Sequence, residues 1–214
     1  MENILITGAN RGIGLAMSQH ANALGHNVIG TGRQAEGLFD LEVTDPASHQ
    51  KFVAGLNGAA IDILVCNAGV YTDKGKSIAD YDPDDWHKSM AVNVMGPFLT
   101  VQALKENLKL AERPRVAIIA SQMGSTARAP GGSYAYRASK AAAVNLARNL
   151  ATDLAAEGIA VGAFHPGWVK TDMGGAEAEI TVDTSAAGLL ARFDALSLAT
   201  SGCFEDWRGQ SLAY

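Results

Sequence analysis

The sequence predicts an α/β protein built as one doubly wound parallel sheet with helices on both faces, with residues 1–214 forming a single domain. Two observations predict this fold. Short apolar runs alternate with helix-like stretches along the chain, and such alternation gives a parallel sheet covered on both sides. The first run, Asn3 to Thr7, leads into a glycine-rich turn and then a helical stretch, the order that a dinucleotide site requires.

The expected strands are short runs of apolar and β-branched residues, which suit a buried sheet. They cover residues 3–7, 27–31, part of 37–43, 61–66, 116–120 and 159–164, with a further short strand near Cys203 and Phe204. Only Arg33 to Gly37 separate the second strand from the third. We therefore expect no helix in that connection.

The expected helices cover residues 15–24, 47–56, 83–112, 134–157 and 181–196. Thr44-Asp45-Pro46 favours a helix start, because proline is well tolerated in the first turn. Gly96-Pro97 predicts a bend in the third helix. Gly158 predicts the end of the fourth helix.

The turn after the first strand is Thr7-Gly8-Ala9-Asn10-Arg11-Gly12-Ile13-Gly14. We expect Gly8 to allow the tight turn, Gly12 to let the backbone approach a pyrophosphate, and Gly14 to let the helix pack closely on the strand. The helix N-terminus that follows offers free N–H groups to phosphates. Asn10, Arg11 and Ile13 complete this expected cofactor loop.

Tyr136 and Lys140 stand four residues apart in a predicted helix, and positions four apart share a helix face. An ammonium beside a phenol favours the phenolate and lowers the tyrosine pKa. We therefore expect Tyr136 to exchange protons near neutral pH. Tyr134 is a rival for this role, but Ala138 stands four residues after it and cannot assist.

Several motifs in order resemble the short-chain dehydrogenase/reductase family. They are Thr7 to Gly14, Asn67-Ala68-Gly69, Asn93, Ser121, Tyr136 with Lys140, and His165-Pro166-Gly167, and together they cover most of the chain. The stretches 134–140 and 165–175 resemble the branch of small carbonyl reductases related to C-factor and sniffer. The resemblance implies a Rossmann-type fold over residues 1–214 and an NAD(P)-dependent oxidoreductase.

The resemblance also implies site roles. Ser121 would bind the substrate carbonyl oxygen, Tyr136 would protonate it, Lys140 would hold the nicotinamide ribose, and Asn93 would hold a water linked to Lys140. Asn67, Ala68 and Gly69 would pack against the cofactor. Pro166, Gly167 and Val169 would meet the nicotinamide, and Thr171 the phosphates. Ser125 and Ser133 are further substrate contacts, Trp168 is a pocket or core residue, and His165 is expected to be structural.

The cofactor expected from the sequence is NADP(H), with NAD(H) left open. The second strand ends Thr31-Gly32-Arg33 without the carboxylate that an NAD site places there. Arg11 and Arg33 can bind a 2′-phosphate in a fork. Glu42 and Val43 are the expected adenine contacts by their distance from Thr44-Asp45, and Asp40 with Leu41 is the rival pair.

We expect reduction of an aldehyde or ketone, or the reverse oxidation of an alcohol. Two alternatives remain: a non-catalytic nucleotide-binding signalling protein on the same scaffold, and an epimerase or dehydratase. The resemblance implies a homodimer or homotetramer formed through helices near 97–110 and 138–157.

Composition excludes other classes. The net charge is −5 with no basic stripe, so we expect no nucleic-acid partner. No apolar run approaches about 20 residues, so we expect no membrane span. Two cysteines give no disulfide framework, and no metal-ligand cluster is present. With no signal peptide visible at the N-terminus, we expect a cytoplasmic protein.

Overall fold

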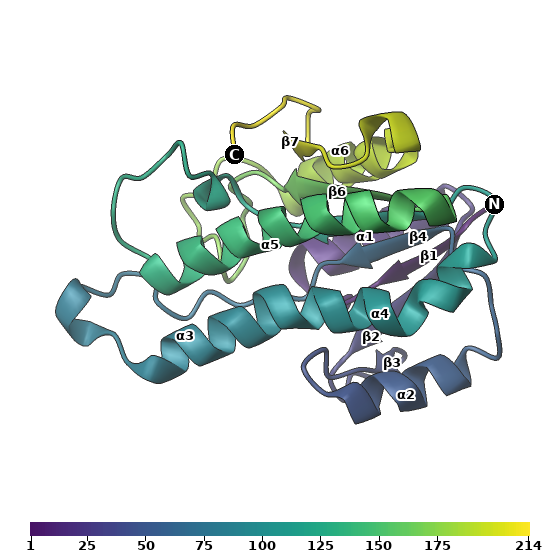
Figure 1. Cartoon of the computed structure of the whole chain (residues 1–214). Helices are drawn as coiled ribbons and strands as arrows, with labels where there is room; N and C mark the ends of the chain where they lie inside the picture. Colours follow the sequence, from purple (N-terminus) through teal and green to yellow (C-terminus); the bar gives the residue numbers. More distant parts are fainter.

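The computed structural model describes residues 1–214 and contains one seven-stranded sheet in which every neighbouring pair is parallel (Figure 1). The strand order is β3-β2-β1-β4-β5-β6-β7. The strands are β1 (Asn3–Ile6), β2 (Asn27–Gly32), β3 (Phe39–Asp40), β4 (Ile63–Cys66), β5 (Arg115–Ile119), β6 (Ala160–His165) and β7 (Phe204–Asp206). The predicted fold class is confirmed.

Helices cover both faces of the sheet. They are α1 (Gly12–Ala23), α2 (Pro46–Gly55), α3 (Pro83–Met90), α4 (Gly96–Lys109), α5 (Tyr134–Leu154) and α6 (Val182–Ala195). One apolar core lies between the sheet and α2, α4 and α5, which stand toward the viewer in Figure 1. A second core lies on the other face, where α1 packs against α6.

The chain crosses from the β3 edge back to β4, which pairs with β1. This reversal of direction opens a crevice beyond the carboxyl ends of β1 and β4, the place where open parallel sheets bind ligands. The loops after β1, β4, β5 and β6 all start at this edge. They carry the glycine-rich turn, Asn67-Ala68-Gly69, Ser121 and Pro166-Gly167, whereas Tyr136 and Lys140 lie on α5 and Asn93 lies in a turn between α3 and α4.

The helix expected over residues 83–112 is interrupted. A π-helical turn, Ala91–Met95, separates α3 from α4, and Pro97 lies in the first turn of α4. This interruption is centred on Asn93, shortly before Gly96-Pro97, where the sequence predicts a bend. At the end of α5 and its short 3₁₀ extension, Gly158 adopts φ +78°, as expected for a residue that stops a helix.

The connection from β2 to β3 contains no helix, as its length predicts. Its backbone folds tightly, with positive φ angles at Gln34 and Gly37. The strand β3 is only two residues long, and its edge lies beside α2 (Figure 1). No helix in the structure has the length and apolar content needed to cross a lipid bilayer.

Candidate active site

The glycine-rich loop after β1 is shaped by two residues that must be glycine. Gly8 has φ +67°, which an L side chain rarely adopts. A Cβ atom on Gly14 would lie 2.2 Å from the carbonyl oxygen of Gly8 and 2.6 Å from Nδ2 of Asn67. The first turn of α1 therefore packs directly on the loop that leads into it, as the sequence predicts.

Asn67 ties the end of β4 to this loop. Its Nδ2 donates to the carbonyl oxygens of Thr7 and Gly8 at 2.9 and 3.0 Å. The Thr7 hydroxyl oxygen accepts from the backbone N–H groups of Asn67 and Ala68 at 3.0 and 3.1 Å. These side chains hold the carboxyl ends of β1 and β4 together, so in this structure Asn67 supports the cofactor loop from behind.

A hollow of about 320 Å³ lies at the start of α1. It is lined on one side by Arg11, Gly12 and Gln19, and on the other by Lys170 and Thr171. The Thr171 methyl group lies 3.5 Å from where a Cβ of Gly12 would stand. The start of a helix, a glycine without a side chain and the cations Arg11 and Lys170 suit a pyrophosphate, so the residues present fit a dinucleotide; the Asp172 carboxylate also lines this hollow and pairs with Arg11.

The expected adenine end lies at β2 and β3. Arg33 Nη1 donates to Glu42 Oε2 at 3.4 Å, and Glu42 Oε1 accepts from both the backbone N–H and the hydroxyl of Thr44. Asp40 instead accepts from the backbone N–H of Gln34. Arg11 pairs with Asp172 at 2.9 Å, and both partners are well exposed. The Arg11 and Arg33 side chains are thus held at the surface by exposed ion pairs, which contribute little to stability.

Tyr136 and Lys140 lie together on the buried face of α5, and Ser121 lies beside them at the start of the segment after β5. The Lys140 Nζ atom is 5.7 Å from the centre of the Tyr136 ring and donates to the carbonyl oxygen of Ile119 at 2.8 Å. A Cβ on Gly124 would lie 2.6 Å from the Lys140 carbonyl group. This close approach packs the segment from Ser121 to Gly124 against α5, the helix that carries Tyr136 and Lys140. Tyr134 is 40% exposed and Tyr136 only 7%, which favours Tyr136 as the acid.

The expected effect of Lys140 on Tyr136 is wrong for the chain without cofactor. Burial raises the pKa of Tyr136 to about 12, with further upward contributions from Tyr71 and Asp73, while the Ser121 side chain lowers it in part. Burial lowers the pKa of Lys140 to about 8. Spacing alone places the two groups but does not give their desolvation, which dominates both shifts. Tyr136 is therefore protonated at neutral pH.

Asn93 occupies the π-helical turn and is buried. Its Oδ1 accepts from the Val70 N–H at 2.9 Å, and its Nδ2 donates to the Val70 carbonyl and the Ser139 hydroxyl, both at 2.9 Å. A Cβ on Gly69 would lie 3.2 Å from Asn93 Oδ1 and 3.6 Å from Lys140 Nζ. Gly69 thus lies between the Asn93 amide and the Lys140 ammonium, and the water expected there stays a prediction.

Sequence reasoning missed Tyr71. Its ring stacks on that of Tyr136, with centroids 4.1 Å apart, and its hydroxyl lies 2.6 Å from the Ser133 hydroxyl. Ser133 itself adopts φ +50° at the start of α5. An aromatic residue two positions after Asn67-Ala68-Gly69 is the only signal that the sequence offers for this contact. Sequence reasoning also missed Lys170, which follows the β6 motif.

The loop after β6 carries Gly167 and Trp168, and it follows His165 at the end of that strand. Gly167 has φ +89°, and a Cβ there would lie 2.6 Å from the Ile180 side chain. Burial lowers the pKa of His165 to about 4, although the charge of nearby Asp206 acts to raise it, so His165 is neutral near pH 7. Its buried Nδ1 has no hydrogen-bond partner. Trp168 is 45% exposed and donates to the Gly174 carbonyl.

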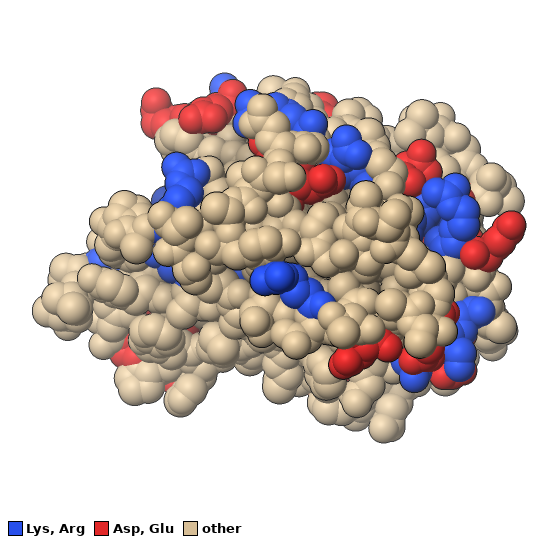
Figure 2. Space-filling view, turned by 45° about the horizontal axis from the view of Figure 1, so that its top comes forward, with Lys and Arg blue, Asp and Glu red and all other residues tan.

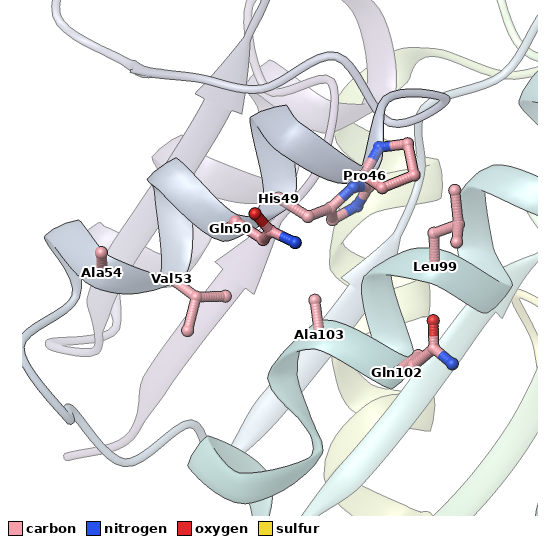
Figure 3. A pocket seen from close by; sticks show the side chains of 8 residues that line it. All are labelled: Pro46, His49, Gln50, Val53, Ala54, Leu99, Gln102 and Ala103. Atoms are coloured by element: carbon pink, nitrogen blue, oxygen red, sulfur yellow. The ribbon is translucent and has the colours of Figure 1, made fainter.

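A groove of about 480 Å³ lies elsewhere, between α2 and α4 (Figure 3). Figure 3 shows His49 and Gln50 of α2 facing Leu99 and Ala103 of α4 across it. None of the expected site residues lines this groove. The candidate active site is therefore the crevice at the carboxyl ends of the strands, where the glycine loop and the Tyr136 cluster meet.

Known proteins share this arrangement. Residues 2–180 match the family model described as short chain dehydrogenase. C-signal of Myxococcus xanthus is 37% identical over 76% of this chain and 98% of its own length. The 1-hydroxy-2-glutathionyl-2-methyl-3-butene dehydrogenase of a Rhodococcus strain is 32% identical over the whole of both chains.

Among solved structures, the NADPH-bound carbonyl reductase from chicken fatty liver superposes with a TM-score of 0.93 at 33% identity, covering 100% of this chain and 99% of that one. The carbonyl reductase Sniffer of Drosophila melanogaster superposes with a TM-score of 0.94 at 27% identity over the whole of both chains. The expected resemblance to small carbonyl reductases is confirmed. From its motifs, its sheet and these relatives, the chain belongs to the short-chain dehydrogenase/reductase family of NAD(P)-dependent oxidoreductases.

Proposed function

We propose that this chain, as one domain over residues 1–214, uses NADPH to reduce the carbonyl group of an aldehyde or ketone. The observation that carries the proposal is the convergence of Ser121, Tyr136 and Lys140 in the crevice that the glycine loop also borders. A neutral phenol with a raised pKa is a proton donor, as reduction requires. NADPH would supply the hydride.

Each side chain has a separate task in this proposal. The Ser121 hydroxyl donates to the substrate carbonyl oxygen and orients it. Tyr136 Oη gives its proton to that oxygen, because the oxygen becomes strongly basic as the carbonyl is reduced. Lys140, held by the Ile119 carbonyl, places positive charge beside the tyrosine when it is protonated and so stabilises the phenolate left behind. Asn93 would hold a water through which the proton returns.

The preference for NADPH rests on the cations at the expected adenine end and on the absence of a carboxylate at the end of β2. The relative from chicken liver is described as NADPH-bound, and one from Burkholderia multivorans as NADP-bound, with 29% identity and a TM-score of 0.88. Arg33 has a side chain 74% exposed, and can leave Glu42 for a phosphate at little cost.

Separate titrations with NADPH and NADH, followed by quenching of tryptophan fluorescence, test the preference. Arg33→Ala should weaken NADPH binding roughly tenfold or more, because a hydrogen bond to a charged group is lost. NADH binding should stay nearly unchanged. Arg113→Ala is the matched control, because Arg113 precedes β5 at the opposite end of the sheet. Equal affinity of the unaltered protein for both nucleotides would contradict the preference.

The relative C-signal favours a second candidate, a signalling protein that binds nucleotide without turnover. A screen of aldehydes and ketones with NADPH separates the two candidates. Carbonyl-dependent oxidation of NADPH supports the reductase, whereas nucleotide binding without turnover across the panel supports the signalling protein.

We also propose that the protein forms homodimers. Apolar side chains that are about 40% exposed lie along α3, the π-helical turn and α4, namely Trp86, Met90, Met95 and Phe98. Figure 2 shows few charged groups over the middle of the side that carries α4 and α5. Such patches mark interfaces. Phe98→Asp should shift the mass measured by light scattering from dimer to monomer, and an unchanged mass would contradict this interface.

A further inference from the structure

The N-terminus of the catalytic helix α5 has no local cap. Ser133, the residue before it, adopts the left-handed conformation and its side chain caps nothing. The first N–H groups of the helix are instead satisfied from a segment about 60 residues earlier. Tyr134 N–H donates to Tyr81 Oη at 3.0 Å, and Ala135 N–H donates to Asp73 Oδ2 at 2.9 Å.

Asp73 also accepts from the N–H of Tyr136 itself, at 3.4 Å. The carboxylate is completely buried, and Tyr81 Oη donates to the same Oδ2 at 3.0 Å. Burial raises the pKa of Tyr81, so its phenol keeps the proton that it donates. A negative charge at the positive end of a 21-residue helix is favourable, and more so when water is excluded.

The segment that carries Asp73 is itself held on both sides. Val70 is paired with Asn93, and the Thr72 hydroxyl bonds to the Asp85 carbonyl and the Ser89 hydroxyl of α3. Lys76 Nζ donates to Asp85 Oδ2 at 2.6 Å. A buried carboxylate on so firmly held a segment can fix the position of whatever its oxygens bind.

Asp73 keeps one feature that helix capping alone does not explain. Its second oxygen, Oδ1, is buried and has no hydrogen-bond partner. Leaving a charged oxygen unpaired is costly, and such groups cluster where function requires them. Here the charge lies within one helical turn of the acid that the proposed reaction uses.

We propose that Asp73 is a positioning residue for Tyr136: by capping α5 from the segment after β4, it fixes the backbone of the proton donor relative to Ser121. The inference rests on the proposed reductase function. It assigns a role to a residue that contacts the proton donor through the backbone N–H of Tyr136 rather than through its phenol. Reaction rates are sensitive to displacements of about 1 Å at the reacting groups, so a loosened first turn of α5 should slow the chemical step.

Two variants separate the components of this role. Asp73→Ala removes both the acceptor and the charge, whereas Asp73→Asn keeps an oxygen that can accept from Ala135 and Tyr136. Asp82→Ala is the matched control, because the Asp82 side chain accepts from the Asp84 N–H and caps α3, a helix without an expected catalytic group. All three are measured for kcat, KM and NADPH affinity on a carbonyl substrate identified by the screen.

We expect Asp73→Ala to lower kcat by about 10- to 100-fold while the Kd for NADPH changes less than about twofold. Asp73→Asn should recover part of that loss, and Asp82→Ala should leave kcat unchanged. A kcat of Asp73→Ala within twofold of the unaltered protein would overturn the proposal. Equal losses of kcat in Asp73→Ala and Asp82→Ala would also overturn it, since they would reflect general destabilisation.

A second measurement does not depend on turnover. Hydrogen exchange at the amides of Ala135 and Tyr136 in the cofactor-free protein should speed up roughly tenfold in Asp73→Ala, the usual effect of losing a helix cap. In Asp82→Ala those two amides should exchange as in the unaltered protein. Unchanged exchange in Asp73→Ala would refute the capping role. Faster exchange without any reductase activity in the unaltered protein would instead refute the proposed function and leave Asp73 as a helix cap only.

Discussion

The side-chain amide of Asn93 pairs with both backbone groups of Val70, accepting from its N–H and donating to its carbonyl oxygen, each at 2.9 Å. The same Nδ2 also donates to Ser139 of α5. One buried side chain therefore connects three parts of the site: the π-helical turn between α3 and α4, the segment after β4, and the helix α5. The interruption of the helix thus lies at the residue whose side chain makes these three contacts.

Asn93→Ala should lower the free energy of unfolding by about 2–4 kcal/mol, because it removes the partner of the buried Ser139 hydroxyl and of both backbone groups of the half-buried Val70. Asn149→Ala is the control: Asn149 is exposed on α5 and bonds only to Asn145 of the same helix, so the change should stay within about 0.5 kcal/mol. Urea denaturation measures both. Equal losses of unfolding free energy in the two variants would contradict a stabilising role for the Asn93 hydrogen bonds.

Gly14→Ala should abolish tight nucleotide binding, because the added Cβ would meet the Gly8 carbonyl oxygen at 2.2 Å and push α1 away from the loop. Gly55→Ala is the same change near the end of α2, where a Cβ meets nothing within 4 Å. The control should be as stable as the unaltered protein or more stable by about 0.5–1 kcal/mol. Fluorescence titration with NADPH measures the effect, and normal binding by Gly14→Ala would show that the close approach is not needed.

Lys140 makes the stability of the cofactor-free protein depend on pH. Its pKa is lowered by burial from 10.5 to about 8, so between these values the unfolded chain binds the proton that the folded chain has released. The stability contributed by this group therefore rises with pH across that window, by about 3 kcal/mol in total. Below pH 8 both states are protonated, and the burial of the charge is a constant cost.

Other groups act in the opposite direction at high pH. Burial raises the pKa values of Tyr136, Cys66 and Cys203 to about 12, so their contribution is lost as pH rises above their unfolded values. The difference between the unaltered protein and Lys140→Met isolates the lysine. That difference, from urea denaturation at pH 7 to 10, should move in favour of the unaltered protein as pH rises. A difference that stays constant would contradict the lowered pKa.

The sequence predicts those features of the site that depend on neighbours along the chain. The roles of Gly8 in the tight turn and of Gly14 in the close packing of α1 follow from their places just after the first strand. The connection after β2 is too short to contain a helix. The position of Tyr136 beside Lys140 follows from helical spacing. The pKa of Tyr136 does not, because it depends on burial among groups from several segments.

Asp73 could not be identified from the sequence either. It lies 62 residues before Ala135, in a segment without regular secondary structure, and no local pattern links a lone aspartate to a distant helix end. The absence of a capping side chain before Tyr134 is the nearest available signal. The expected ordered water and the cofactor contacts of Pro166 and Val169 stay predictions.

The central claim is that Tyr136 donates a proton to a carbonyl reduced with NADPH. The most direct test compares NADPH oxidation by the unaltered protein and by Tyr136→Phe on the carbonyl panel, with the NADPH Kd measured for both. The account predicts that Tyr136→Phe loses activity by about 10²–10⁴-fold, the usual worth of a general acid, while the Kd stays within about twofold. Undiminished turnover by Tyr136→Phe would contradict the account.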